Sequence, residues 1–292
     1  MTERTKGASV GLVLEGGGMR GAFTAGVLDF WMEKGLLLKD VYGVSAGACQ
    51  ACSYLCHQLG RGLRVWTDYI NDPRFCSMRS LLTTGDLFGA KLNYDLVPRV
   101  YDPLDDAAFK ASGARFTAVV TNAVTGEAEY LPITDMQRDV AIIRASASLP
   151  LISRMVRIGG KAYLDGGVAD SIPIRRSIED GHAFNVVVLT QAAGYRKTPN
   201  RALPLMRLRY ARYPKLVDAI ARRHADYNAS LALVEEEARA GRAFILRPDE
   251  PPEVGRVEKD PQKLRRLHDV GYAVANREYD ALLQFLKGCE QA

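Results

Sequence analysis

The stretch V-Y-G-V-S-A-G, residues 41–47, decides the local fold around which the rest of this sequence can be arranged. Val41 to Val44 is a short apolar run that predicts a strand, and the Ala- and Cys-rich residues after it predict a helix to about Leu59. Gly43 and Gly47 remove side chains that would collide around so tight a turn. A Ser45 that ends a strand and opens a helix is typical of a nucleophile elbow, where the helix amino terminus stabilises negative charge on the serine oxygen. The alternative is a strand-to-helix turn with an incidental serine.

A second glycine-rich motif, G-G-G-M-R-G at residues 16–21, follows an apolar run from Val10 to Glu15 and precedes a helical pattern. It matches the dinucleotide fingerprint G-x-G-x-x-G, and Asp40 lies near the position expected for the acid that binds the ribose. That interpretation leaves the G-x-S-x-G motif unexplained. We therefore favour an oxyanion hole, in which one donor contributes roughly 3 to 4 kcal/mol, formed by the backbone N–H groups of Gly16, Gly17 and Gly18.

None of the four histidines is well placed to take the proton of Ser45. His57 lies farther along what is predicted to be the same helix, about 18 Å away at a rise of about 1.5 Å per residue. His182 lies in the turn before a predicted strand, whereas open α/β sheets place their sites at the carboxyl ends of strands. His224 and His268 lie in charged helices of the last third, and only a fold-back of that segment would bring either one to Ser45.

Asp165 is the better candidate for the base. It directly follows a strand predicted at Lys161 to Leu164 and is followed by Gly166 and Gly167, so its carboxylate has little steric cover. A free carboxylate with a pKa of about 3.9 is a poor base at neutral pH, so the site must perturb it by burial or a similar effect. An ordinary turn of the D-G type is the alternative, and the other two motifs favour the base.

Helices alternate with strands along the chain, which predicts one α/β domain. Hairpins are predicted within residues 115–131 and 156–164, and residues 184–190 form an apolar strand of the kind buried on both faces. Helices are predicted at about residues 23–35, 135–146, 174–180, 203–240 with a break at Pro214, and 261–286. We expect a core at about residues 8–195 and a helical C-terminal extension at about residues 200–290.

The composition is that of an ordinary globular chain of 292 residues, with 47% apolar and 25% charged residues. The longest stretch without a charged residue, Val41 to Gly60, is too polar for a lipid-facing span. Residues 1–8 hold no apolar stretch of secretory length, so export is not supported. The helical spacing of Cys49, Cys52 and Cys56 favours small buried side chains in a reducing cytoplasm, and a zinc site that includes Cys76 is the alternative.

The net charge of +5 depends on a basic stretch from Arg201 to Arg223, in which Asp218 is the single acid. Such a stretch suits contact with anionic lipid headgroups, and it suits a solvated face equally well. It carries no reader motif or base-stacking aromatics, so nucleic acid is not expected as a partner. We expect a cytoplasmic protein, with peripheral contact at an anionic inner membrane surface as one option.

Three motifs in this order, G-G-G-x-R-G at residues 16–21, G-x-S-x-G at 43–47 and D-G-G at 165–167, resemble those of the patatin-like phospholipases, in particular the bacterial patatin-like acyl hydrolases. The segment A-S-A-S-L-P at 145–150 is similar to that family's A-S-x-x-P, with either its first or its second Ala-Ser pair as the counterpart. The resemblance covers about residues 10–191. It implies a three-layer α/β/α fold with a mostly parallel central sheet and a helical C-terminal segment.

By the same resemblance, Ser45 is the nucleophile and Asp165 the base of a Ser-Asp dyad, with no catalytic metal or cofactor. The residues that support the motifs are Arg20, Gly21, Gly43, Gly47, Gly166 and Gly167. We expect a serine lipid acyl hydrolase of the phospholipase A or lysophospholipase type that cleaves fatty acyl esters of lipids. A Ser-His-Asp carboxylesterase and a non-catalytic lipid-binding protein on the same fold are the alternatives. The sequence leaves acyl chain, headgroup, acyl acceptor and oligomeric state open.

Overall fold

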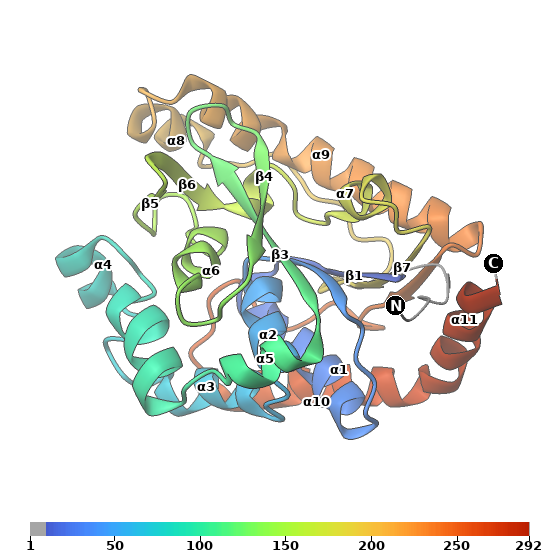
Figure 1. Ribbon diagram of the computed structural model, residues 1–292. Helices are drawn as coiled ribbons and strands as arrows, with labels where there is room; N and C mark the ends of the chain where they lie inside the picture. The colour runs from blue at the N-terminus through green and yellow to red at the C-terminus, as the bar shows by residue number, and fades with distance from the viewer. Residues whose placement is uncertain (1–9, 292) are drawn as a thin grey trace.

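The structure of the protein is a computed structural model that describes residues 10–291. Residues 1–9, on which the expectation about a secretion signal rests, and residue 292 lie outside the described residues. A central sheet lies between two layers of helices (Figure 1), so the predicted three-layer α/β/α fold is confirmed.

The sheet is mixed, with a parallel centre and one antiparallel side. Its strands follow the order β5-β6-β3-β2-β1-β7-β8, and β4 pairs with β3. The set from β3 to β8 is parallel, while β4, β5 and β6 pair in antiparallel fashion. The strands are β1 (Val10–Leu14), β2 (Asp40–Val44), β3 (Arg115–Asn122), β4 (Ala128–Ile133), β5 (Val156–Ile158), β6 (Lys161–Asp165), β7 (Phe184–Val188) and β8 (Ala243–Leu246).

Helices cover both faces of the sheet (Figure 1). On one face lie α1 (Gly21–Glu33), α2 (Ala46–Leu55) and α10 (Pro261–Arg277), and on the other α7 (Ile174–Glu179) and α9 (Pro214–Arg239). The remaining helices are α3 (Arg61–Tyr69), α4 (Met78–Thr84), a π-helix η2 (Leu92–Tyr101), α5 (Asp106–Ser112), α6 (Val140–Ser146), α8 (Leu203–Arg209), α11 (Tyr279–Gln291) and two short 3-10 helices, η1 (Gly18–Arg20) and η3 (Gly166–Val168).

Alternate residues of the central strands pack into different hydrophobic layers. In β1, Leu12 and Leu14 join the large cluster that contains the buried residues of α1, whereas Val13 joins the cluster that contains those of α9. In β7, Val186 and Val187 divide in the same way. Because successive side chains of a strand point to opposite faces, a strand between two helical layers must be apolar at every position, which explains the uninterrupted apolar runs in the sequence.

Strand β3 brings the ends of β2 and β6 together. Val119 pairs with Val44, the last residue of β2, and the next residue, Val120, pairs with Asp165, the last residue of β6. Strand β4 pairs with both of these β3 residues along the opposite edge. Strands β2 and β6 therefore share one edge of β3 and meet end to end, which places residue 45 next to residue 165.

The C-terminal segment packs into the same core. Strand β8 extends the sheet beside β7, and α10 crosses α1 so closely that two glycines form the contact. A Cβ atom on Gly26 of α1 would collide with the His268 carbonyl oxygen, and one on Gly271 of α10 would collide with the Phe23 carbonyl oxygen. The two helix backbones can approach this closely because both positions lack side chains.

The structure differs from the sequence expectations at several element ends. Helix α2 ends at Leu55, because His57 adopts a positive φ of 55°. Residues 135–139 form turns instead of a helix, because the Asp139 carboxylate accepts hydrogen bonds from the backbone N–H groups of Thr134 and Asp135. The last predicted helix is two helices, α10 and α11, and β8 was not predicted. The expected burial of cysteines is confirmed for all but Cys49, which is partly buried.

Candidate active site

Ser45 occupies a strained turn between β2 and α2. Its backbone has φ 54° and ψ −121°, a conformation that residues other than glycine rarely adopt, and 5% of the residue is exposed. Gly43 lies against the Ala48 backbone and Gly47 against the carbonyl oxygens that follow β1, so neither position has room for a Cβ atom. The turn therefore has the geometry of a nucleophile elbow, as the sequence predicts.

Ser45 and Asp165 form a direct hydrogen bond in a buried site. The Ser45 hydroxyl donates to Asp165 Oδ2 at 2.6 Å, and the Gly167 N–H donates to Asp165 Oδ1 at 2.8 Å. Asp165 is 1% exposed, and burial raises the pKa of its carboxyl above the ordinary value. The positive charge of Arg223 and the two hydrogen bonds oppose that rise in the pKa. An ionised carboxylate here can accept the serine proton without an intervening imidazole.

The four histidines lie elsewhere. His182 lies beside Asp40, at the amino end of β2, with its Nε2 3.5 Å from a carboxylate oxygen. His268 Nε2 lies 2.8 Å from Asp29 Oδ2 on α1, and His224 Nδ1 contacts the Ala221 carbonyl oxygen at 3.0 Å. His57 is exposed beyond the end of α2. Within residues 10–291, no histidine forms a hydrogen bond with Ser45.

The segment A-S-A-S-L-P, residues 145–150, forms hydrogen bonds with both Ser45 and Asp165. Ser45 donates its backbone N–H to Ser146 Oγ at 2.9 Å, and Asp165 donates its backbone N–H to the Ser148 carbonyl oxygen at 2.8 Å. The sequence left open which Ala-Ser pair matters. In the structure, the first serine supports the nucleophile through its side chain, and the second supports the carboxylate residue through its backbone.

The glycine loop lies directly against the serine. A Cβ atom on Gly16 would be 3.2 Å from Ser45 Cβ, and one on Gly17 would be 2.6 Å from the hydroxyl oxygen of Thr190. The Gly16 N–H donates to the Ser171 carbonyl oxygen at 3.3 Å, so this amide is already engaged. The N–H groups of Gly17 and Gly18 have no acceptor within residues 10–291. Two of the three predicted donors are therefore free to bind another atom.

The other motif residues shape the surroundings of the loop. Gly21 lies against Ala46, the first residue of α2, and Gly166 lies against the Val119 backbone, so both positions allow close packing. Arg20 is half-buried beside Glu15, and its Nε atom has no hydrogen-bond partner in the described part of the chain. Across residues 10–291, no group of three or more His, Cys, Asp or Glu side chains is placed to hold a metal ion.

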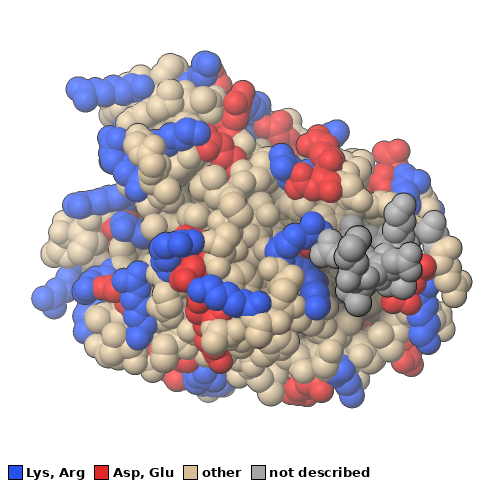
Figure 2. Space-filling model, in the orientation of Figure 1, with Lys and Arg blue, Asp and Glu red and all other residues tan. Residues whose placement is uncertain are grey.

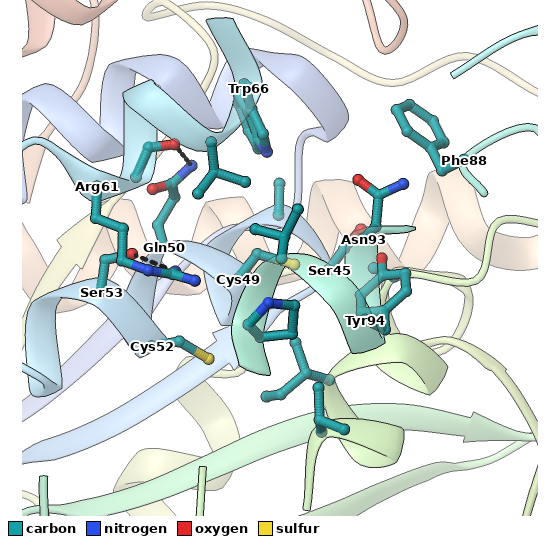
Figure 3. Close-up of a pocket in the computed structure, with 18 of the residues that line it drawn as sticks. Ser45, Cys49, Gln50, Cys52, Ser53, Arg61, Trp66, Phe88, Asn93 and Tyr94 are labelled. Carbon is teal, nitrogen blue, oxygen red and sulfur yellow. Dashed lines mark hydrogen bonds between the residues drawn. The ribbon is translucent and has the colours of Figure 1, made fainter. Parts of the chain in front are cut away.

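A cavity of about 120 Å³ opens beside Ser45. Figure 3 shows Asn93 and Tyr94 beside the serine, and Arg61 at the other end near Cys52 and Ser53. Most of the lining is apolar and includes Trp66, Phe75, Phe88, Val97, Leu104 and Ile143. Residues 60–112 carry no sequence motif, so the part of the lining that the π-helix η2 and its neighbours supply could not be predicted from the sequence.

Two family models match separate parts of the chain. Residues 12–177 match the model of the patatin-like phospholipase family, and residues 213–287 match a domain of unknown function, DUF6363. The chain is 28% identical over 259 residues to the uncharacterized protein YjjU of Escherichia coli, a match that covers 83% of this chain and 69% of that one. It is 25% identical over 178 residues to the uncharacterized NTE family protein Rv1063c of Mycobacterium tuberculosis, covering 59% and 47% of the two chains.

The match therefore spans about half the length of the mycobacterial relative. Among solved structures, VipD from Legionella pneumophila superposes with a TM-score of 0.49 at 16% identity, covering 96% of this chain and 67% of that chain. The family match extends over more than half of the chain and contains all three sequence motifs. The chain belongs to the patatin-like phospholipase family, whose general class is that of lipid acyl hydrolases.

Proposed function

We propose that this protein hydrolyses fatty acyl esters of lipids, with Ser45 as the nucleophile and Asp165 as the base. The observation that carries the proposal is the 2.6 Å hydrogen bond between the two side chains. It lies in a buried site with the serine on a strained turn, beside an apolar cavity. This arrangement meets the geometric requirement for a nucleophile and its base, which must lie within hydrogen-bond reach of each other.

The proposed reaction has two halves. Asp165 takes the proton of the Ser45 hydroxyl as the serine oxygen attacks the ester carbonyl carbon, and the negative charge moves to the carbonyl oxygen. The carbonyl reforms, the alcohol leaves with the proton from Asp165, and an acyl-serine remains. Water then attacks the acyl-serine while Asp165 accepts a proton from it. When this second intermediate collapses, the fatty acid leaves and Asp165 returns the proton to the serine.

The free glycine amides suit the charge that develops during attack. We assign the oxyanion hole to the N–H groups of Gly17 and Gly18, because the Gly16 amide is engaged with Ser171. In this assignment Gly16 allows the loop to approach the serine. Fixed donors aimed at a developing oxyanion are worth roughly 3 to 4 kcal/mol each in other acyl-transfer enzymes.

The surroundings of Asp165 suit a base. Burial raises the pKa of its carboxyl, which increases its affinity for the serine proton. Arg223 opposes the rise in the pKa and so favours the ionised form that the reaction needs. Arg223 is therefore proposed as a positioning residue that acts through Asp165.

The cavity is the proposed site of the acyl chain. Its apolar walls match a hydrocarbon chain, and Ser45 lies in its lining, so an ester at the end of such a chain would reach the hydroxyl. A substrate of the phospholipase A or lysophospholipase type meets this requirement.

Active-site labelling tests the dyad. Ser45→Ala and Asp165→Asn should each abolish turnover of a lipid panel and labelling by a fluorophosphonate, while variants with each histidine changed to alanine keep both. Asp170→Asn is the matched control, because Asp170 is a partly buried carboxylate whose pKa is also raised by burial, but it bonds to Tyr130. A folded Asp165→Asn protein that turns over substrate would exclude the dyad. Lipid binding without any Ser45-dependent turnover would favour the non-catalytic alternative.

We also propose that α8 contacts an anionic membrane surface, as at the inner face of a cytoplasmic membrane. Leu205 and Leu208 are 54% and 78% exposed on this helix, among exposed arginines at 201, 207, 209 and 212. Figure 2 shows Lys and Arg side chains projecting from the end of the molecule that carries α8. Exposed apolar residues among cations are typical of helices that lie on membranes. Within residues 10–291, no helix is both long and apolar enough to span a bilayer.

A further inference from the structure

Four cationic side chains from separate parts of the chain gather around the glycine loop. Arg20 follows the loop, Lys197 lies between β7 and α8, Arg223 lies on α9, and Arg256 lies between β8 and α10. These charges lie close enough to affect one another. Burial lowers the pKa of Lys197 to about 6, the nearby arginines add to this effect, with Arg223 contributing the most among them, and Glu15 opposes it. We call these four residues the cationic cluster.

Direct contacts place three members of the cluster, Arg223 and Lys197 through their side chains and Arg256 through its backbone. The Arg223 guanidinium donates to the Gly167 carbonyl oxygen, and Lys197 Nζ lies 3.7 Å from the centre of the Tyr227 ring. The Arg256 carbonyl oxygen accepts a hydrogen bond from the Met19 N–H at 3.1 Å, which holds this residue against the loop.

The positive charge of the cluster is not balanced by nearby acids. Within residues 10–291, no member of the cluster forms a salt bridge. The two acids that act on it are Glu15 and Asp165. The oxygens of Glu15 accept hydrogen bonds from Tyr227 and Thr190, and those of Asp165 from Ser45 and Gly167. Arg20, Lys197 and Arg223 are half-buried, and Arg256 is exposed. Half-buried cations without a counter-ion are costly, and a bound anion would reduce that cost.

The cluster and the apolar cavity both adjoin the glycine loop, but no member of the cluster lines the cavity. Gly18 lines the cavity, and its Cα atom also lies against the Arg256 backbone. Arg223 contacts Gly167, whose N–H supports the Asp165 carboxylate. An ester bound at Ser45 would therefore have both an apolar cavity and cations close to it. A glycerophospholipid has the same polarity, with its phosphate a few bonds from the ester.

We propose that the cationic cluster is a subsite for the phosphate group of the substrate, so that these residues determine how far the protein discriminates between phosphate-bearing and neutral glycerolipids. The proposal deepens the proposed function and rests on it. Arginine binds phosphate oxygens through its planar fork of donors, and lysine binds them as a compact charge. The subsite is assembled from both halves of the chain, since Arg223 and Arg256 belong to the segment that matches the domain of unknown function.

A pair of substrates with the same acyl chains tests the subsite. Dihexanoylglycerophosphocholine and dihexanoylglycerol, both kept below the concentrations at which they aggregate, differ only in the headgroup. The kcat/KM for the phosphocholine ester divided by that for the diacylglycerol should fall about tenfold in Lys197→Gln and in Arg256→Gln, because each change removes one donor to phosphate. Arg222→Gln is the matched control, since Arg222 precedes Arg223 on α9 but is exposed and pairs with Asp226. Its ratio should stay within about twofold of the unchanged protein. A ratio that is equally stable in Lys197→Gln and Arg256→Gln overturns the proposal.

A binding experiment separates this proposal from the proposed function. Titration of Ser45→Ala with inorganic phosphate needs no turnover, and Lys197→Gln added to that background should weaken binding about tenfold. Loss of phosphate binding with an unchanged substrate ratio would assign the cluster to free phosphate and overturn the headgroup subsite. Phosphate binding by a protein that hydrolyses neither ester would overturn the proposed function alone.

Discussion

Gly26 of α1 and Gly271 of α10 face each other where the two helices cross, and each lies against backbone atoms of the opposite helix. The contact joins the N-terminal part of the core to the C-terminal segment. Added methyl groups would force the helices apart and disturb a core in which both helices bury many side chains.

Gly271→Ala should therefore lower the free energy of unfolding by about 1 to 3 kcal/mol, as overpacked cores do. Urea unfolding measures this change. Gly288→Ala is the matched control, because Gly288 is also helical but has open space around its Cα atom. There the better helix propensity of alanine should stabilise the protein by up to about 1 kcal/mol. Equal effects at the two positions would show that the helix crossing tolerates a side chain.

Ser146→Ala should lower both the stability of the protein and its activity. The change removes the acceptor for the Ser45 backbone N–H and leaves a buried donor unsatisfied, at a cost of about 1 to 3 kcal/mol in the free energy of unfolding. We also expect kcat to fall, because the strained backbone of Ser45 loses one of its restraints. Ser148→Ala should cost less activity, since the carbonyl oxygen that accepts from Asp165 remains. The opposite order of the two variants would contradict this role of Ser146.

Asp165→Asn should raise stability at neutral pH while it removes activity. Burial raises the pKa of Asp165 above its unfolded value of about 3.9, so the stability from this group is present below the unfolded pKa and is lost as pH rises through the folded pKa. The neutral asparagine avoids that loss. Urea unfolding at pH 7 should therefore favour the variant, and the gain should shrink as pH falls towards 4. Asp249→Asn should show the opposite sign, because Arg277 lowers the pKa of Asp249. An Asp165→Asn variant that is less stable than the unchanged protein at pH 7 would argue against a raised pKa for Asp165.

Anion binding at the cationic cluster should take up protons. Lys197, which faces Arg20, Arg223, Arg256 and Glu15, has a pKa lowered to about 6 and is mostly neutral at pH 7. A bound sulfate would favour the charged form and raise that pKa. Calorimetric titration with sulfate at pH 7, in buffers of different ionisation enthalpy, should detect proton uptake that is absent in Lys197→Met. Binding without uptake would place the anion away from Lys197.

Leu208→Glu should weaken binding to vesicles that contain phosphatidylglycerol, because it removes an exposed apolar side chain and adds a charge of the wrong sign to α8. Vesicle sedimentation at low and high salt measures both contributions. Val270→Glu, at an exposed apolar position on α10, should leave vesicle binding as it was. Equal loss in both variants would mean that α8 has no special part in membrane contact.

The sequence was sufficient to predict the residues of the candidate site that belong to local patterns. A strand, a glycine-flanked serine and a helix determine their own geometry within a few residues, so the turn at Ser45 could be predicted from residues 41–47 alone. Asp165 was chosen as the candidate base because it directly follows a predicted strand and precedes two glycines. The histidines were set aside on position, and the structure places all four away from Ser45.

Features that depend on distant contacts could not be predicted in this way. Arg223 lies near the glycine loop because α9 contacts the turn after β6, and Lys197 lies beside Tyr227 of the same helix. Arg256 lies there because the segment after β8 contacts Met19. The cavity lining between residues 60 and 112 lacks any motif, and β8 is only four residues long. The engagement of the Gly16 amide with Ser171 is likewise a tertiary contact that no local pattern encodes.

The position of β8 has a consequence for how this protein can be divided. The two family matches separate residues 12–177 from 213–287, yet the sheet begins in the first and ends in the second. A shortened protein that stops near residue 200 would expose the free edge of β7, whose unpaired backbone groups invite aggregation. Such a fragment would also lose α10 and half of the cationic cluster. The C-terminal segment is thus not a detachable module, and an exchange of this segment between relatives must also match the strand edge and helix surface that receive it.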